Sequence, residues 1–294
     1  MLSRVAAHLI LGPRPEPFLA PMLESLRGAC DMVLVNDNSP EPSPHAQTLA
    51  ESAFAQEGRL VVDRTPFTDF ATARNVCVRL HEEHNAGEWM LFVDADEVHG
   101  PQLAKAARNL ERVPEGVDFV DAYTWHFFQS FDWYRSIERA KTFIRATPGF
   151  HWEGVVHEKL HGPSGKRIAL PYVFGHYGWV LPIERQAQKE ILYASLGRPG
   201  AMLPQHELET PDLERSFAHE WRTVLRFRGS HPPAVQPVIA RLRADLAAQF
   251  ARVDEIVPRY QPPKQRIVNL MMSLNYEQRW RLRALNPPAR RLLA

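Results

Sequence analysis

The first third of the chain alternates short apolar runs with stretches of helical periodicity, and this alternation limits the possible folds more than any other feature. Each apolar run is rich in Val, Leu or Ile and ends at turn residues, which is typical of a buried strand. We predict strands at residues 5–11, 32–36, 60–63 and 89–93. Apolar residues at helical spacing predict helices at residues 18–27, 46–56 and 70–84. This order predicts an α/β fold with a mostly parallel sheet that carries helices on both faces.

The pattern changes near residue 117. Further strands are predicted at residues 117–125, 141–145 and 167–173, and helices are predicted at residues 183–196, 213–228 and 234–256. Proline pairs at 232–233, 262–263 and 287–288 would end helices there. We therefore predict a catalytic α/β domain over residues 1–181 and a helical C-terminal extension over residues 182–294.

Charge and cysteine content narrow the class of protein. The 35 Lys and Arg residues nearly balance the 34 Asp and Glu residues, whereas a dedicated nucleic-acid-binding protein has a clear basic excess, so we expect no nucleic-acid partner. No apolar stretch is long enough to span a membrane. Cys30 and Cys77 lack the spacing of metal ligands. These features predict a cytoplasmic protein with two buried thiols.

The C-terminal end is basic and amphipathic, with Arg279, Arg281 and Arg283 followed by Arg290 and Arg291. Such a tail could rest on an anionic membrane surface, which would bring the protein to the inner face of the membrane. A helix face exposed to solvent is the simpler interpretation of the same residues.

Two carboxylates follow the fourth predicted strand. Asp94 and Asp96 are two positions apart, so an extended backbone would point both side chains to the same side. Ligands of parallel sheets bind beyond the C-terminal ends of the strands, where these residues lie. A divalent cation would relieve the repulsion between the two carboxylates and could bridge phosphate oxygens. The alternative is that acidic residues here only stabilise the first turn of the next helix.

Asp37 and Arg74 lie at the same predicted edge of the sheet. Asp37 ends the second strand and could accept hydrogen bonds from a nucleobase or a ribose, although an Asx turn explains it equally well. Arg74 is near the start of the helix that follows the third strand, where a guanidinium group suits a pyrophosphate. An arginine on an exposed helix face is the alternative for Arg74.

Taken together, these motifs resemble the family-2 glycosyltransferases, which have the GT-A fold. The resemblance rests on five segments in the expected order, at residues 33–39, 73–75, 89–97, 151–160 and 175–179. It implies a GT-A fold for the first domain and an enzyme that transfers a sugar from a nucleotide-diphosphate donor. The sequence departs from the usual family pattern after the first strand and after Asp37.

The resemblance also implies roles for individual residues. Asp37 and Arg74 would contact the nucleotide, Asp94 would reach the ribose or the metal, and Asp96 would coordinate the metal directly. His176 matches a histidine that often completes the metal site in this fold. The implied cofactor is Mn²⁺ or Mg²⁺, and a neutral imidazole ligand suits Mn²⁺ better.

Transfer with inversion at the anomeric carbon needs a carboxylate that deprotonates the acceptor hydroxyl. Glu158 matches the family position of this base, with Glu153 as the second candidate, and a structural salt bridge is the alternative for either residue. Aromatic residues near them could stack on a sugar, so we expect Trp133 or Trp152 near the acceptor, with core packing as the alternative. The acceptor itself, whether a glycan, a lipid-linked molecule or a protein, has no readable signature.

Two other functions remain open from the sequence. Residues 92–98 also fit the first motif of haloacid-dehalogenase-type phosphatases, in which Asp94 would be the nucleophile, but the later acidic pair of that family is missing. The chain could also be a nucleotide- or carbohydrate-binding protein that has lost turnover. The presence of Asp96, Glu158 and His176 favours an active enzyme.

Overall fold

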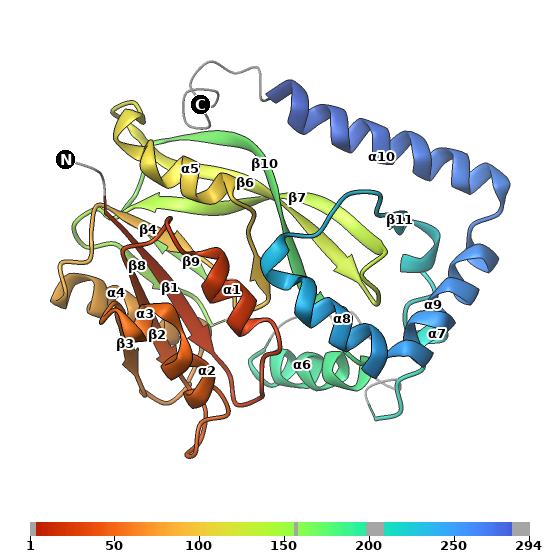
Figure 1. Cartoon of the computed structure of the whole chain (residues 1–294), viewed down its shortest axis with the longest axis horizontal. Coiled ribbons are helices and arrows are strands. Elements are labelled where there is room, and N and C mark those ends of the chain that lie inside the picture. Colours follow the sequence, from red (N-terminus) through yellow and green to blue (C-terminus); the bar gives the residue numbers. More distant parts are fainter. Residues whose placement is uncertain (1–3, 156–157, 198–208, 284–294) are drawn as a thin grey trace.

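The computed structural model describes residues 4–155, 158–197 and 209–283. A nine-stranded sheet forms its centre, in the order β3-β2-β1-β4-β7-β6-β10-β5, with β11 paired to β7 (Figure 1). The strands of this sheet are β1 (Val5–Leu11), β2 (Met32–Asp37), β3 (Leu60–Asp63), β4 (Trp89–Phe92), β5 (Glu97–Val98), β6 (Val117–Phe128), β7 (Trp133–Arg145), β10 (Lys166–Trp179) and β11 (Leu225–Arg226). A separate pair consists of β8 (His151–Glu153) and β9 (Lys159–His161).

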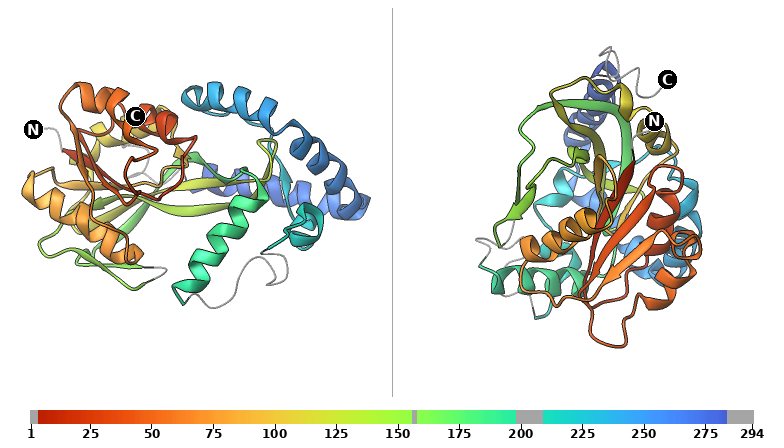
Figure 2. Two further views of the ribbon diagram at one scale, coloured as in Figure 1. Left: turned by 90° about the horizontal axis from the view of Figure 1, so that it is seen from below. Right: turned by 90° about the vertical axis from the view of Figure 1, so that its left-hand side faces the viewer.

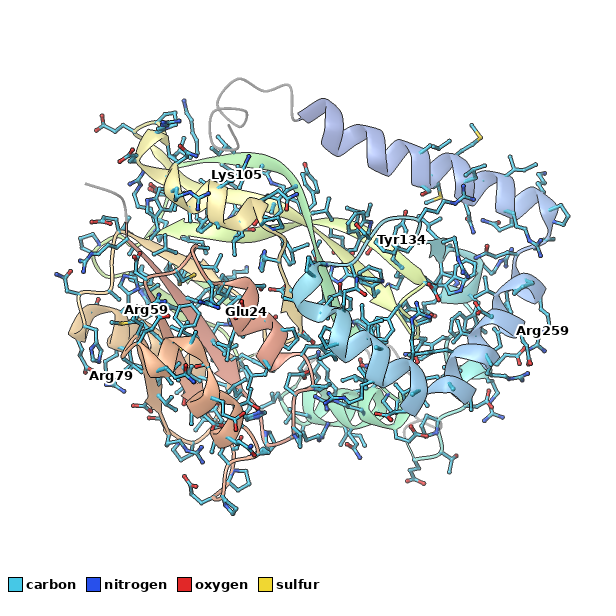
Figure 3. All side chains as sticks on the ribbon, viewed as in Figure 1. Glu24, Arg59, Arg79, Lys105, Tyr134 and Arg259 are labelled. Carbon is cyan, nitrogen blue, oxygen red and sulfur yellow. The ribbon has the colours of Figure 1, made fainter. Side chains whose placement is uncertain are left out.

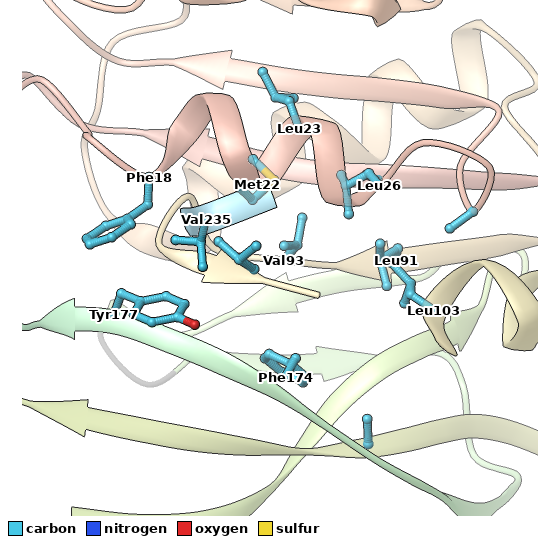
Figure 4. Packing of buried hydrophobic residues seen from close by; sticks show 14 of the residues in the cluster. Phe18, Met22, Leu23, Leu26, Leu91, Val93, Leu103, Phe174, Tyr177 and Val235 are labelled. Carbon is cyan, nitrogen blue, oxygen red and sulfur yellow. The ribbon is translucent and has the colours of Figure 1, made fainter. Parts of the chain in front are cut away.

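Helices cover both faces of the first four strands, as the apolar pattern predicted (Figure 2). These helices are α1 (Leu19–Ser25), α2 (Ala46–Glu51), α3 (Ala53–Gln56), α4 (Phe70–Glu83) and α5 (Gln102–Arg108). Alternate side chains of β1 point to opposite faces. Ala7 and Leu9 belong to the same buried cluster as Met22 of α1, whereas Ala6 packs with Leu80 of α4. Figure 4 shows Met22 beside Leu23 and Leu26 in the first of these clusters. The predicted α/β fold is therefore confirmed.

The sheet is mixed rather than purely parallel. Strands β3, β2, β1 and β4 are parallel, but β7 runs antiparallel to both β4 and β6. The cause is local: only residues 129–132 separate β6 from β7, and so short a connection can join only antiparallel strands. The aromatic segment at residues 125–134 forms the end of β6, this turn and the start of β7.

The C-terminal extension is helical but less regular than its periodicity suggested. Its helices are α6 (Ile183–Ser195), α7 (Leu213–Ser216), α8 (Gln236–Asp245), α9 (Ala247–Tyr260) and α10 (Pro263–Arg283). The helix predicted over residues 213–228 is wrong, because α7 is followed by a 3₁₀ turn (Glu220–Arg222) and by β11. Phe217 and Trp221 are drawn into a buried cluster with Phe128 of β6 instead.

The extension also adds a strand to the sheet of the first domain, since Leu225 of β11 pairs with Tyr134 of β7. The domain boundary at residue 181 stays a prediction. No helix within the described ranges is both long enough and apolar enough to cross a membrane. Of the basic tail, Arg290 and Arg291 lie outside the described residues, and α10 extends as far as Arg283.

Candidate active site

A cavity of about 470 Å³ opens at the carboxyl ends of β1 and β4. Its walls come from the segment after β1, the start of α4, the turn after β4, the end of β10 and helix α6. Its polar lining residues are Arg14, Glu16, Asn38, His45, Arg74, Asp94, Asp96, Glu158, His176, Arg185, Gln186, Lys189 and Tyr193. Ligands of α/β sheets bind at this edge, so the cavity is the candidate active site.

Arg74 joins two of the predicted site residues. The side chain of Asp69 caps α4 by accepting a hydrogen bond from the backbone N–H of Thr72, and Arg74 follows in the next turn. Its Nε donates to Glu158, and its Nη2 donates to Asp94 Oδ1 over 3.2 Å. The guanidinium group also lies over the ring of Phe92, 4.1 Å from the ring centre. Arg74 is thereby held in one orientation, almost fully buried.

The opposite charges of Arg74 and Asp94 stabilise the charged form of each group. Burial alone would lower the pKa of Arg74, but Asp94 and Glu158 raise it above its ordinary value. Burial raises the pKa of Asp94, yet Arg74 and His176 outweigh that effect and lower it overall. By contrast, burial and the neighbouring Asp94 raise the pKa of Glu97 well above its ordinary range. The carboxyl group of Glu97 accepts a hydrogen bond from the backbone N–H of Asp94 over 3.1 Å.

The pairing of β5 with β10 brings Asp96 and His176 together. His176 is the register partner of Glu97, and its Nε2 lies 3.4 Å from Asp96 Oδ1. Asp96 Oδ1 is buried without a hydrogen-bond partner in the described residues. The absence of a side chain at Gly178 makes room for the other carboxylate oxygen, because a Cβ there would lie 2.1 Å from Asp96 Oδ2.

His126 of β6 is a neighbour of this pair that the sequence analysis did not single out. Its Nδ1 lies 3.2 Å from Nδ1 of His176, on the opposite side of the His176 ring from Asp96. Burial, and then the nearby His176, lower the pKa of His126 to about 4, so it is neutral at neutral pH. A hydrogen bond at Nδ1 fixes which nitrogen of His176 is free to bind a ligand.

These residues fit a divalent cation in part. Asp96 offers a buried oxygen without a hydrogen-bond partner, and His176 offers a nitrogen beside it. Among the described residues, no group of three or more His, Cys, Asp or Glu side chains is arranged to hold a metal ion. A Mg²⁺-type site commonly has only one or two protein ligands and is completed by water and substrate phosphates.

Asp37 lies outside the cavity lining. Its carboxylate accepts hydrogen bonds from the backbone and hydroxyl of Ser39 and from the hydroxyl of Ser43, and it binds Arg64. Burial would raise the pKa of Asp37, but these hydrogen bonds lower it. The Asx-turn alternative therefore describes its contacts, and the neighbouring Asn38 lines the cavity instead.

The second base candidate and the two tryptophans also lie apart from the cavity lining. Glu153 is exposed on β8 and binds His151 over 2.9 Å. Trp152 is buried against Phe92. Trp133 donates to Asp254 of α9 over 3.0 Å. Of the residues predicted for the site, the structure brings together Arg74, Asp94, Asp96, Glu158 and His176.

Basic residues from outside the motifs complete the cavity. Arg14 follows β1, and Arg185 and Lys189 are four positions apart on α6. Burial would lower the pKa of Lys189, but Tyr193, Asp96 and Asp94 raise it. Arg185 binds Glu16. Burial and the nearby Asp96 raise the pKa of Glu16 to about 7. The spacing of Arg185 and Lys189 on one helix face was the signal available in the sequence.

Comparisons with known proteins identify the family. The model of glycosyl transferase family 2 matches residues 14–167, which is more than half of the chain. A search of curated protein sequences found no match. Among solved structures, the mannosyltransferase PcManGT from Pyrobaculum calidifontis, in complex with GDP-Man and Mn²⁺, is 15% identical; the match covers 97% of this chain and 87% of that chain, with a TM-score of 0.42.

Glucosyl-3-phosphoglycerate synthase from Mycobacterium tuberculosis is 14% identical, over 42% of this chain and 44% of that chain, with a TM-score of 0.30. GalNAc-T7, with UDP, GalNAc and Mn²⁺, is 12% identical over 50% of this chain and 30% of that chain, with a TM-score of 0.32. The family match is the decisive finding, because it spans the segments that carry Arg74, Asp94, Asp96 and Glu158. The chain belongs to glycosyl transferase family 2 and is a glycosyltransferase of the GT-A type.

Proposed function

We propose that this enzyme transfers a sugar from a nucleotide-diphosphate donor to an acceptor hydroxyl, with inversion and with the help of a divalent cation. One observation carries the proposal: Asp96, His176 and Glu158 line the same cavity as the positively charged residues Arg14 and Lys189. Carboxylate and imidazole ligands together with fixed positive charge suit a diphosphate and its cation.

Asp96 and His176 would hold the cation, and the imidazole ligand favours Mn²⁺ over Mg²⁺. A bound cation would offset the negative charge of the departing diphosphate. Lys189 and Arg14 would bind the phosphate oxygens directly, and Arg185 would extend this basic wall. Positive groups fixed before the reaction stabilise the leaving group without having to reorganise.

Glu158 is the proposed general base. Its carboxylate lines the cavity, whereas Glu153 lies on an exposed strand and binds His151. Arg74 would position Glu158 through the hydrogen bond from its Nε, leaving the other carboxylate oxygen to accept the proton of the acceptor. Asp94, on the second arm of Arg74, would face the donor ribose or the cation.

The test is a panel of nucleotide sugars with different bases, incubated with Mn²⁺ or Mg²⁺ and assayed for nucleotide release. We expect turnover of at least one donor, with loss of turnover in Asp96→Asn and Glu158→Gln and near-normal turnover in Glu153→Gln. Donor binding measured by thermal shift separates loss of chemistry from loss of binding. Binding without turnover in the parent protein would favour the inactive binding protein, and release of phosphate from simple phosphomonoesters would favour the phosphatase.

A further inference from the structure

Helix α10 carries its apolar residues on the outside. Ile267, Leu270, Met271 and Leu274 are spaced three and four positions apart, so they form one stripe. Their exposed fractions are 62%, 45%, 67% and 51%. A helix on the surface of a globular protein normally turns such a stripe toward the core.

The inward face of α10 is polar. Asn269 is buried and donates from Nδ2 to the backbone oxygen of Arg222 over 3.0 Å. Ser273, one turn later, forms a hydrogen bond of 3.0 Å with the hydroxyl of Tyr134, a residue at the start of β7 (Figure 3). Gln265, one turn earlier, donates to Asn269 over 2.9 Å. Hydrogen bonds therefore hold the helix on the protein, and none of the described residues covers its apolar stripe.

The charge around this stripe is strongly positive. In the described part of this segment, residues 261–283, the sequence has five Lys and Arg residues but only one acidic residue, Glu277. Lys264 and Arg266 are exposed at the start of α10. Arg228 and Arg266 also line a cavity of about 280 Å³ beside the helix, to which Leu270 contributes. An apolar stripe bordered by basic residues matches an anionic lipid surface.

We propose that α10 docks this enzyme on an anionic membrane surface, with Ile267, Leu270, Met271 and Leu274 inserted at the level of the lipid headgroups. The charge argues against the obvious competitor, a second copy of the chain. Two copies that paired through α10 would bring two strongly basic segments together, with one acidic residue in each to offset them. In Figure 1, α10 lies across the sheet from α6, so docking leaves the cavity wall formed by α6 free.

The experiment is flotation of the full chain with vesicles of phosphatidylcholine alone or mixed with phosphatidylglycerol. We expect binding to the anionic vesicles only, weakened by added salt. The double variant Met271→Asp/Leu274→Asp should lose roughly tenfold or more in partitioning, because it places two charges in the inserted stripe. Val62→Asp, at a 40% exposed valine on β3, is the matched control and should bind as the parent does.

Three outcomes would overturn the proposal: no binding to anionic vesicles, equal binding by the Met271→Asp/Leu274→Asp variant, or a parent dimer in sedimentation that this variant converts to a monomer. The last result would assign the stripe to a second copy. Turnover of a soluble donor should be the same in parent and double variant, since neither residue lines the active-site cavity. Failure of the docking proposal is thereby distinguished from failure of the proposed function.

Discussion

The guanidinium group of Arg74 holds the carboxylate of Glu158, a residue 84 positions further along the chain. Both side chains are close to fully buried, with 9% and 11% of their surfaces exposed. The second arm of the same guanidinium group holds Asp94. One arginine thus sets the distance between the residue that follows β4 and the proposed general base.

Replacing Arg74 by Met should therefore abolish turnover and lower the free energy of unfolding by about 3 kcal/mol, because Glu158 would remain buried without its partner. Arg74→Lys should recover little, since an ammonium group cannot reproduce the two-armed contact. The control is Arg79→Met on the exposed face of the same helix, where loss of the pairs with Asp63 and Glu83 should cost less than about 1 kcal/mol. Equal effects of the two Met variants in urea unfolding would contradict this account.

Gly178→Ala should impair the proposed metal site selectively. The added Cβ would overlap Asp96 Oδ2 and force the carboxylate away from His176. We expect the Mn²⁺ concentration needed for half-maximal turnover to rise by roughly tenfold, while the melting temperature changes little. In Gly100→Ala the new Cβ would meet only the movable end of Gln102, so its metal requirement should stay that of the parent.

His126→Phe tests whether His126 positions the proposed metal ligand. Phenylalanine keeps an aromatic ring at this position but lacks the nitrogen that faces Nδ1 of His176. The affinity for Mn²⁺, measured by calorimetry, should fall by about tenfold. His126→Asn, which can offer a polar atom again, should recover part of the affinity, and an unchanged affinity in the Phe variant would show that His126 only fills space.

Lys189→Met should raise the KM for the donor roughly tenfold, because a charge-assisted contact to phosphate is lost. The value of kcat should fall less, since the reacting groups Glu158 and Asp96 stay in place. Lys105→Met, an exposed lysine of α5, is the control and should leave both constants unchanged (Figure 3). A fall in kcat with an unchanged KM would argue against a donor-binding role for Lys189.

The raised pKa of Glu16 predicts a pH dependence of stability. Burial and Asp96 raise this pKa from 4.5 to about 7 in the folded protein, so the folded state binds more protons than the unfolded state between these values. The free energy of unfolding should therefore fall as the pH rises from about 4.5 to about 7, by roughly 1–3 kcal/mol from this group.

In Glu16→Gln this contribution should vanish, and the slope of the unfolding free energy against pH should become smaller over that range. Glu24→Gln on α1 is the matched control, because Glu24 is exposed and pairs only with the exposed Arg27 among the described contacts. Its slope should be the same as that of the parent. A steeper slope in Glu16→Gln would reverse the sign expected here.

The strands that alternate with helices could be predicted well from the sequence. The bounds of β1 and β3 match the prediction, because each is a short, mainly apolar run bounded by polar residues or glycine. Strand β7 was predicted only over residues 141–145, since its first half is rich in charged and aromatic residues that do not alternate. The helix predicted over residues 213–228 failed because burial of Phe217 and Trp221 outweighed local periodicity.

The residues of the candidate site also differ in how far the sequence could predict their positions. Asp94, Asp96 and Arg74 follow strands or start helices, so a rule on sheet edges could place them together. Lys189 could not be placed in this way, because its position depends on how α6 packs across the sheet edge. Asp37 has the correct position on β2 but turns its side chain toward Ser39 and Arg64, a choice made by the loop that follows.

The short strand β11 has a consequence for how this enzyme can be divided. It covers part of β7 by pairing with Trp133 and Tyr134, and α6 of the same extension forms a wall of the candidate active-site cavity. A chain that stopped at residue 181 would expose the edge of β7 to pairing with other molecules and would lack Arg185 and Lys189. We therefore expect the family-2 segment to need the extension for activity, so that the first could not be exchanged between enzymes without the second.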